Sequence, residues 1–261
     1  MSTAQTTYMR PGYHSITPYL IVNDAGGLLD FLKKAYGAEE ALRVPDEKGG
    51  IRHAEVRIGD SVVALADATP QYPPRPAALH LYVPDADAIY ARAIEAGAES
   101  LRAPADQFYG DRESGVRDRS GNTWWIATRI GAPAGHHIPE GLRSVTPFLH
   151  PKSVTDLIRF LKLAFDAEEG SIHRDPDGRV LHAAVKIGDS MLEMGEPHGE
   201  FQPMPTALQL YVPDVDRTYS RALEAGATSD AEPENKPYGD RMAGVTDAFG
   251  TSWFIGQFLG G

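Results

Sequence analysis

The chain has 261 residues, enough for two ordinary domains, and its 42% hydrophobic and 23% charged residues are typical of a globular protein. A formal net charge of −11 without a basic stripe argues against nucleic acid, and no apolar run approaches the roughly 20 residues that a membrane helix needs. The lack of cysteine excludes disulfides, thiolate metal sites and a cysteine nucleophile.

The first half of the chain follows the order β-α-β-β-β twice. A helix over about 26–36 carries one apolar stripe and ends at Gly37, and a second helix begins at the capping residue Asp85 and ends at Gly97. Gly59-Asp60 is a two-residue hairpin signal between two alternating strands. Seven of the eight strands in this order can be placed, at residues 15–22, 52–58, 61–66, 78–83, about 99–103, 115–117 and 123–130.

The second half repeats the first at an offset of 129 residues. The tetrapeptide YGDR occurs at Tyr109–Arg112 and again at Tyr238–Arg241. The same offset aligns two copies each of IGDS, LYVPD and EAGA. A period this long indicates a duplicated domain rather than a solenoid repeat, so the chain carries four βαβββ modules.

The repeat also predicts the domain boundaries. Residues 1–12 form an N-terminal tail, residues 13–130 the first domain and residues 143–261 the second. Residues 131–142 are rich in Gly, Pro and Ala and are expected to be a linker, on which the paired His136 and His137 belong to solvated surface.

Several motifs of the modules resemble those of a known superfamily. They are ITPYLIV, HAEVRIGDS, LHLYVPDADAIYARAIEAGAE, FYGDR and DRSGNTWW, each with a counterpart in the second copy. The chain resembles the vicinal oxygen chelate superfamily, which includes glyoxalase I, bleomycin-resistance proteins and extradiol dioxygenases, and within it the PhnB-like branch. The resemblance implies an α+β fold of tandem glyoxalase-like domains, in which four βαβββ modules form curved mixed sheets around open cavities.

Strand alternation places aromatic and polar side chains together on one face of each module, and leucine, valine and isoleucine on the other. An apolar wall with a few polar groups is typical of a small-molecule pocket, although a core of aromatic and satisfied polar residues has the same pattern. The predicted ligand-binding residues on these faces are Thr17, Tyr19, His80, Tyr82 and Trp125 in the first copy, and Thr146, Phe148, Glu193, Gln209, Tyr211 and Phe254 in the second.

The resemblance also implies where a metal would be bound. Metal-dependent members place His, Glu or Gln at four strand positions, and a catalytic site usually needs three protein ligands. Only His80, Glu193 and Gln209 are candidate ligands here, and the bulky Trp125 and Phe254 replace the usual last carboxylate. We therefore expect no metal cofactor, with a divalent ion as the alternative. The residues at the four metal-ligand positions of the superfamily are Thr17, Ala64, His80 and Trp125 in the first copy and Thr146, Glu193, Gln209 and Phe254 in the second.

The pairing of the modules decides which of these residues meet. Some members of the superfamily build a cavity from modules of different domains, which would join Thr146 and Glu193 with His80 and Trp125. A carboxylate beside an imidazole can orient the ring and raise its basicity, so Glu193 and His80 would be the catalytic residues of an acid–base enzyme.

Two repeated features have both a structural and a functional interpretation. His53 and His182 match between the copies, and each either binds a ligand or hydrogen-bonds a neighbouring loop. In YGDR, Tyr109 and Tyr238 could stack on a flat ligand while Arg112 and Arg241 bind its acidic group. Alternatively, the glycine of the motif allows a turn and its aspartate pairs with a nearby arginine or caps backbone amides.

Three functions follow from these observations. The first is a metal-free protein that binds an apolar or aromatic small molecule, with a cationic group suited to an acidic protein. The second is an enzyme of the same superfamily, a lyase, isomerase or dioxygenase that uses a metal or the Glu193/His80 pair. The third is an interaction module in which the duplication mainly buries a domain–domain face.

The remaining expectations concern location and assembly. The N-terminal 15 residues are polar and lack the apolar core of a secretory signal, so a cytoplasmic protein is expected. We expect neither a nucleic-acid nor a membrane partner. A tandem chain can make internally the sheet pairing that single-copy relatives make as dimers, so a monomer is expected, with a homodimer as the alternative.

Overall fold

The computed structural model describes residues 8–133, 135–199 and 202–260. Its contacts divide the chain into two compact units. The first unit comprises Pro18–Leu149, and the second comprises Met1–Thr17 together with His150–Gly261. The first unit therefore includes all of the strand Val145–Leu149 from the second sequence copy, and the second unit includes the first two residues of the strand Ile16–Val22 from the first copy. The predicted domain boundaries follow the sequence repeat and stay predictions.

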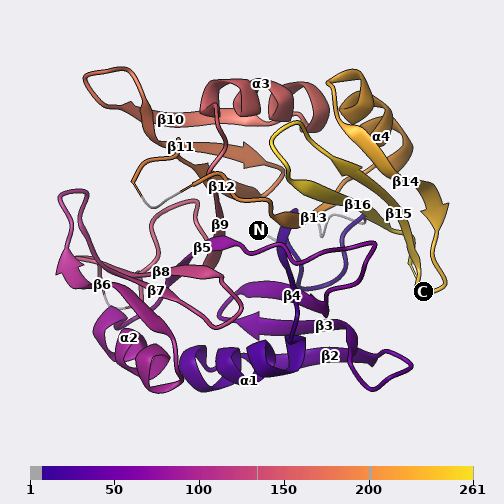
Figure 1. The fold of residues 1–261 in the computed structure, drawn as a ribbon. Coiled ribbons are helices and arrows are strands. Elements are labelled where there is room, and N and C mark those ends of the chain that lie inside the picture. The colour runs from indigo at the N-terminus through magenta and orange to yellow at the C-terminus, as the bar shows by residue number, and fades with distance from the viewer. Residues whose placement is uncertain (1–7, 134, 200–201, 261) are drawn as a thin grey trace. The chain divides into compact units, whose positions relative to one another are not determined.

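The first unit contains two βαβββ modules and one additional strand (Figure 1). The first module is β1 (Ile16–Val22), α1 (Ala25–Tyr36), β2 (Glu39–Pro45), β3 (Ile51–Ile58) and β4 (Ser61–Asp67). The second module is β5 (Ala78–Tyr82), α2 (Ala86–Glu95), β6 (Glu99–Asp106), β7 (Asp111–Arg117) and β8 (Thr123–Arg129), and the additional strand is β9 (Val145–Leu149).

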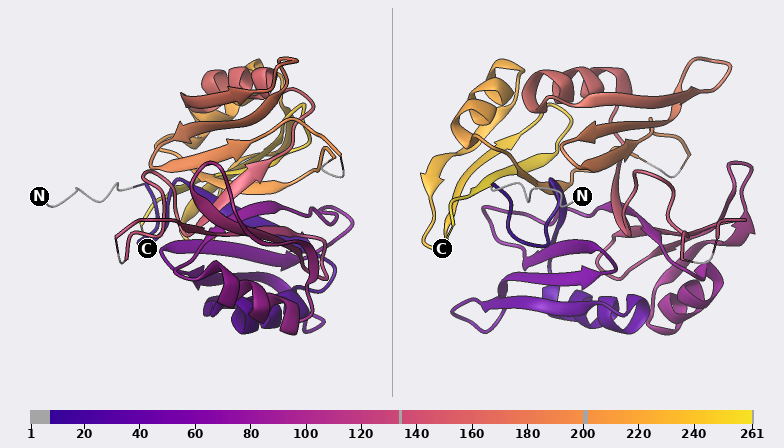
Figure 2. Two further views of the ribbon diagram at one scale, coloured as in Figure 1. Left: turned by 90° about the vertical axis from the view of Figure 1, so that its left-hand side faces the viewer. Right: turned by 180° about the vertical axis from the view of Figure 1, so that it is seen from behind.

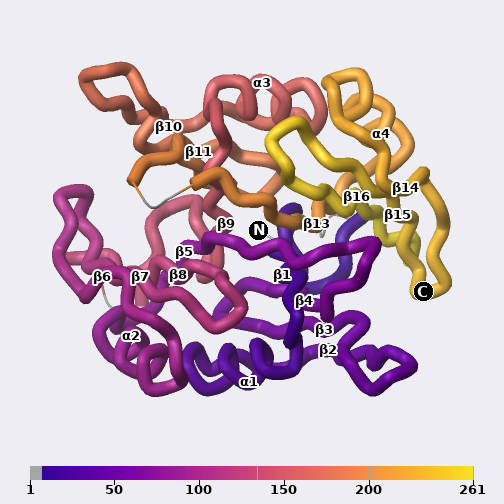
Figure 3. The backbone as a smooth tube through the Cα atoms, viewed as in Figure 1, coloured from indigo at the N-terminus to yellow at the C-terminus, as the bar shows by residue number. Residues whose placement is uncertain are grey.

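The second unit repeats this order from its first helix onward. Its elements are α3 (Val154–Phe165), β10 (Glu168–Arg174), β11 (Val180–Ile187), β12 (Ser190–Met194), β13 (Ala207–Tyr211), α4 (Val215–Glu224), β14 (Thr228–Asn235), β15 (Asp240–Thr246) and β16 (Ser252–Phe258). Helices α3 and α4 lie side by side, as the backbone trace shows (Figure 3).

The sheets are mixed within each module. Strand β1 runs parallel to β4, which pairs antiparallel with β3, and β3 with β2. Strand β5 runs parallel to β8 and antiparallel to β9, and β13 runs parallel to β16. The α+β fold of four glyoxalase-like modules that the repeat predicted is confirmed, with helices on one face of the strands (Figure 2).

Helix caps and an apolar face explain why these elements form. Asp24 and Asp85 accept hydrogen bonds from the third residue of α1 and α2, and Gly37 ends α1 in the left-handed conformation. The strand faces that the alternation assigned to helix packing do form the core of the first unit, including Leu20, Leu65 and Leu79. Burial of this apolar surface is the main source of stability.

The sequence pattern missed one strand and shortened another. Strand β2 (Glu39–Pro45) is exposed along almost its whole length, so it lacks the apolar alternation that identifies a half-buried strand. Strand β7 begins at Asp111, four residues before the predicted start. Its first residues were not recognised as a strand because they are polar, although most of them are buried. YGDR therefore ends inside a strand, and only its tyrosine and glycine belong to the turn.

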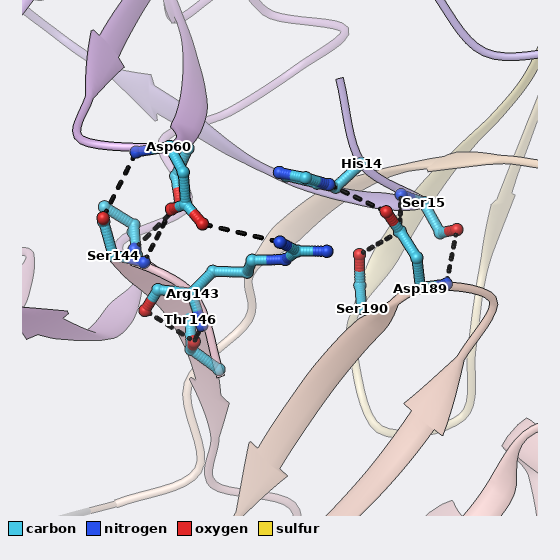
Figure 4. Close-up of polar contacts among 10 residues, drawn as sticks. His14, Ser15, Asp60, Arg143, Ser144, Thr146, Asp189 and Ser190 are labelled. Carbon is cyan, nitrogen blue, oxygen red and sulfur yellow. Dashed lines mark hydrogen bonds and ion pairs between the residues drawn. The ribbon is translucent and has the colours of Figure 1, made fainter. Parts of the chain in front are cut away.

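The repeated IGDS motif fastens a hairpin to the start of a neighbouring strand (Figure 4). In the first unit, Asp60 Oδ1 accepts a hydrogen bond from the Ser144 amide at 2.9 Å, and the Ser144 hydroxyl accepts one from the Asp60 amide at 3.2 Å. Gly59 has a φ of +59°, and a side chain there would collide with Ser144 Oγ. This position therefore needs glycine both for its backbone and for the close approach.

The second unit contains the same clasp with its own residues (Figure 4). Asp189 Oδ1 accepts from the Ser15 amide at 2.7 Å, and the Ser15 hydroxyl accepts from the Asp189 amide at 3.1 Å. Burial alone would raise the pKa of Asp189, but hydrogen bonds from His14 and Ser15 outweigh it and lower that pKa. In both units the clasped serine belongs to the other sequence copy, so the units interleave the two copies.

The tryptophan of each last strand is anchored by a buried aspartate. The Trp124 indole N–H donates to Asp118 at 2.9 Å, and the Trp253 indole N–H donates to Asp247 at 2.9 Å. Burial is the main reason that the pKa of both aspartates is raised. Each aspartate–tryptophan hydrogen bond therefore holds the last strand of its module, β8 or β16, on the side that faces the helices.

The first unit buries one hydroxyl group that its counterpart lacks. Tyr36 packs 4.9 Å from the Trp124 ring, and its hydroxyl has no hydrogen-bond partner among the residues that the structure describes. Burial, followed by the charge of Asp118, raises the pKa of Tyr36 well above its usual range. The matching residue in the second unit is Phe165, which packs 4.7 Å from Trp253.

We expect Tyr36→Phe to stabilise the protein by about 1 kcal/mol, because it removes a buried hydroxyl that has lost its water and gained no partner. Urea unfolding measures the change, and the reciprocal Phe165→Tyr should destabilise by a similar amount. A clear loss of stability in Tyr36→Phe would contradict the assignment of this hydroxyl as unsatisfied.

Candidate functional site

Three adjacent strands of the first unit bring the predicted site residues into one row. His80 on β5 is in register with Trp125 on β8 and with Thr146 on β9. Alternation then puts Tyr82 and Phe148 on the same face. The Phe148 ring lies 5.4 Å from the imidazole of His80, and His80 and Trp125 are each 9% exposed.

Glu113 completes this group and was missed by the sequence analysis. It lies on β7, is 4% exposed, and its Oε2 lies 3.7 Å from Nε2 of His80. Its other oxygen forms an ion pair with Arg102 of β6. A comparison of the copies would have found it, because the residue 129 positions later is Met242.

Arg102 also covers the face of Trp125. Its guanidinium carbon lies 5.1 Å from the centre of the Trp125 ring, within the range of a cation–π interaction. Trp125 can lie flat over β7 because residue 115 is glycine, and a Cβ atom there would collide with the ring. We call His80, Arg102, Glu113 and Trp125 the His80 cluster.

Tyr109 borders the His80 cluster and ties it to YGDR. Burial, followed by the charge of Glu113 and a hydrogen bond to it, raises the pKa of Tyr109. Tyr109 is nevertheless 42% exposed, so its ring lies at the edge of the cluster. The predicted stacking residue thus lies next to the candidate site in the first unit.

The aspartate of YGDR is a buried structural anchor in both copies. Asp111 accepts a hydrogen bond from the Tyr82 hydroxyl at 3.0 Å and pairs with Arg129 at 3.0 Å. In the second unit, Asp240 accepts from the Tyr211 hydroxyl at 3.1 Å and pairs with Arg10 at 3.1 Å. The structural interpretation of this residue is confirmed. Arg129 and Arg10 do not correspond in the sequence repeat, so the alignment of the two copies does not reveal that they have the same role.

The arginine of YGDR binds the first turn of the neighbouring helix. Arg112 pairs through two nitrogens with Asp87 of α2, and its pKa is raised mainly by these hydrogen bonds. Arg241 pairs in the same way with Asp216 of α4. Both residues were predicted to bind an acidic group of a ligand, and in the structure each binds a helix carboxylate of its own module.

We expect Asp111→Asn to destabilise the protein by roughly 1 to 3 kcal/mol, since it leaves Arg129 without its buried counter-charge. Arg112→Ala should have a much smaller effect, because that exposed pair is well solvated. Urea unfolding of both variants measures the difference. Equal losses of unfolding free energy in the two variants would contradict the view that Asp111 is a buried anchor and Arg112 a solvated surface contact.

The matching face of the second unit is less polar. Gln209 on β13 is in register with Phe254 on β16, and Tyr211 lies beyond them. Burial raises the pKa of Tyr211, and the charge of Asp240 adds to the effect. Met242 and Ala231 stand where the first unit has Glu113 and Arg102. Thr17, predicted to bind a ligand, is 2% exposed in this unit.

Both repeated histidines have a carboxylate partner. Nε2 of His53 lies 2.8 Å from Glu55, and Nε2 of His182 lies 3.0 Å from Glu193. The predicted catalytic Glu193 is thus the partner of His182 within its unit, and Glu113 is the partner of His80. The proposed Glu193–His80 pair would join the two units and stays a prediction.

At the ligand positions that the superfamily uses, the donor atoms of the first unit do not fit a metal site. In the first unit, only His80 among His80, Trp125 and Thr146 carries a good ligand atom, and the Thr146 hydroxyl lies within hydrogen-bond distance of the Arg143 backbone (Figure 4). Over residues 8–133, 135–199 and 202–260, no group of three or more His, Asp or Glu could hold an ion. We derive no step through a metal.

A hollow of about 300 Å³ lies elsewhere in the first unit. It is lined by α1, the end of α2 and the turn between β7 and β8, with Lys34 and Arg119 opposed by Asp30 and Asp118. None of the lining residues belongs to the His80 cluster. The cluster remains the stronger candidate site, because it combines an imidazole, a buried carboxylate and aromatic faces.

Comparisons with known proteins identify the family. A model described as the Glyoxalase/Bleomycin resistance protein/Dioxygenase superfamily matches residues 12–126. An uncharacterized protein of Mycobacterium bovis is 38% identical over 127 residues, which are 44% of this chain and 84% of the relative. One of Mycobacterium tuberculosis is 38% identical over 127 residues, 44% of this chain and 75% of the relative. The chain belongs to the glyoxalase/bleomycin resistance protein/dioxygenase superfamily.

Solved structures agree on the fold of the whole chain. Glyoxalase I from Zea mays superposes with a TM-score of 0.67 at 15% identity, covering 93% of this chain and 92% of that one. A putative dioxygenase from Bacillus subtilis superposes with a TM-score of 0.62 at 12% identity, covering 94% and 85%. At such identities the likeness concerns the fold alone. In the described part of this chain, no helix is long and apolar enough to cross a membrane.

Proposed function

We propose that this protein binds a small aromatic molecule at the His80 cluster, as a metal-free member of its superfamily. The observation that carries the proposal is the difference between the copies. The scaffold residues of YGDR repeat, whereas His80, Arg102, Glu113 and Trp125 become Gln209, Ala231, Met242 and Phe254. A charged group with aromatic faces, present in only one of two copies on the same scaffold, is not needed for the fold.

The chemistry of the cluster favours a flat ligand with a positive group. Trp125 and Phe148 supply ring faces, and Glu113 is a buried carboxylate that pairs with Arg102 and lies 3.7 Å from His80. The protein as a whole carries a net charge of −11, which attracts cations. Arg102 is half-exposed and could turn outward to let a cation take its place beside Glu113.

Three probes with one naphthalene ring test this proposal: 2-naphthamidine, 2-naphthamide and 2-naphthoate. We expect calorimetry to give the order cation, neutral, anion in decreasing affinity, and Trp125→Leu to weaken 2-naphthamidine binding about tenfold. Glu113→Gln should remove the preference for the cation over the neutral amide.

The matched control is Phe254→Leu in the second copy, which should change affinity less than twofold. Thermal unfolding of each variant shows whether a loss of affinity reflects a loss of fold. Equal binding by wild type and Trp125→Leu, or no binding of any probe, would contradict the proposal.

The second candidate is an acid–base enzyme, favoured by the 3.7 Å contact between His80 and Glu113. The Glu193/His80 pair is the alternative form of this proposal. Deuterium exchange at the methyl carbon of acetophenone, followed by NMR, measures proton abstraction directly. Catalysed exchange that His80→Ala abolishes would support it. The exchange rates of Glu113→Gln and Glu193→Gln would then show which carboxylate assists His80. Absence of catalysed exchange would count against it.

Location and assembly complete the proposal. A cytoplasmic monomer without nucleic-acid or membrane partners is consistent with the charge and composition, and a homodimer is the alternative. The motifs also support membership of the PhnB-like branch.

A further inference from the structure

Three side chains of the first unit form a second site, outside the His80 cluster. The Tyr19 hydroxyl lies 2.8 Å from Nδ1 of His53, and Nε2 of the same imidazole lies 2.8 Å from Oε1 of Glu55. We propose that Tyr19 is a nucleophile activated by the His53–Glu55 pair, and that its substrates are electrophilic acyl compounds.

Strand register explains how the tyrosine reaches the histidine. Tyr19 on β1 is in register with Ala64 on β4, and Ala64 is in register with Glu55 on β3. Neighbouring strands are roughly 4.8 Å apart, so the Tyr19 side chain has to pass over β4 to meet His53 on β3. The small methyl group of Ala64 leaves that path open.

The partners decide where the protons lie. An ionised carboxylate only accepts hydrogen bonds, so Nε2 of His53 carries a proton and donates it to Glu55. Nδ1 then offers a lone pair, and the Tyr19 hydroxyl donates to it. This is the order of a nucleophile, a base and an orienting carboxylate, with a phenol in the first position.

The second copy keeps half of this arrangement. His182 has a carboxylate partner at 3.0 Å, but that partner is Glu193 rather than the residue matching Glu55, which is Ala184. Glu193 and Ala184 are cross-strand neighbours, as Glu55 and Ala64 are. The carboxylate has therefore changed strand while its contact with the imidazole is preserved. At the position matching Tyr19 stands Phe148, so the nucleophilic oxygen belongs to the first copy alone.

Burial suits a reactive group that still meets small molecules. Tyr19 is half-buried, the His53 side chain is 25% exposed and that of Glu55 is 13% exposed. The shielding of Glu55 strengthens its interaction with a positive imidazole, because less water competes for the charge.

The proposed step transfers an acyl group to Tyr19. The Tyr19 oxygen attacks the acyl carbon, and its proton passes to Nδ1 of His53 while the Glu55 carboxylate stabilises the imidazolium. The bond from the acyl carbon to the leaving group breaks, and the imidazolium returns the proton to the leaving group. The products are an acyl ester of Tyr19 and the protonated leaving group, without an oxidant or reductant.

Acetylation of the full chain by N-acetylimidazole tests the proposal. Peptide mass spectrometry gives a separate rate for each tyrosine, and we expect Tyr19 to react at least about tenfold faster than Tyr90 and Tyr219. These two phenols are also half-buried, but each donates to a serine hydroxyl at 2.7 Å rather than to an imidazole paired with a carboxylate. A Tyr19 rate no higher than theirs would overturn the proposal, whether or not any variant folds.

Two substitutions separate activation from mere support. Glu55→Gln can still accept the hydrogen bond from His53 but carries no charge, so we expect it to slow Tyr19 acetylation about tenfold, with partial recovery in Glu55→Asp. His53→Gln should slow it at least as much, and His182→Gln should leave it unchanged. An unchanged Tyr19 rate in Glu55→Gln would show that the pair only holds the ring in place, and would overturn the proposal.

Discussion

Three modules depend on a parallel pairing between their first and last strands, which are β1 and β4, β5 and β8, and β13 and β16. Two parallel strands need a connection that crosses from one end of the sheet to the other, and here each connection includes a helix. The helix covers one face of the strands, which is therefore leucine- and valine-rich. The alternate residues, such as Tyr19, His80 and Trp125, are left on the opposite face. The candidate chemistry of this chain therefore lies on that face.

The duplication separates residues that the fold needs from residues that it does not. The IGDS clasps, the buried aspartate of YGDR and the Asp118–Trp124 anchor occur in both copies with nearly the same distances. The counter-charge of the YGDR aspartate shows that a structural need can be met by unrelated parts of the chain, since Arg129 supplies it in one unit and Arg10 in the other. The carboxylate partners of His53 and His182 likewise come from different strands, since Glu55 lies on β3 and Glu193 on β12. The His80 cluster has no such replacement in the second copy, which is why it is assigned to function.

Sequence patterns predicted the modules, the caps at Asp85 and the face on which His80, Trp125, Thr146 and Phe148 lie, because alternation and capping are local properties. Strand alternation did not single out Glu113, because a buried carboxylate gives no local signal until its partner strand is known; only its replacement by Met242 in the second copy marks it in the sequence. Strand β2 was missed because its exposed residues have no apolar period. The arginines of YGDR looked like ligand-binding groups, and only the structure shows the helix carboxylates that hold them.

The central claim is that both copies provide the same scaffold and that binding depends on the residues in which they differ. A single fourfold variant tests it, with His80→Gln, Arg102→Ala, Glu113→Met and Trp125→Phe, so that the first copy carries the residues of the second. Calorimetry with 2-naphthamidine, alongside thermal unfolding, measures the outcome. The account predicts a folded protein that no longer binds the probe. A folded variant that binds it as tightly as wild type would contradict the account.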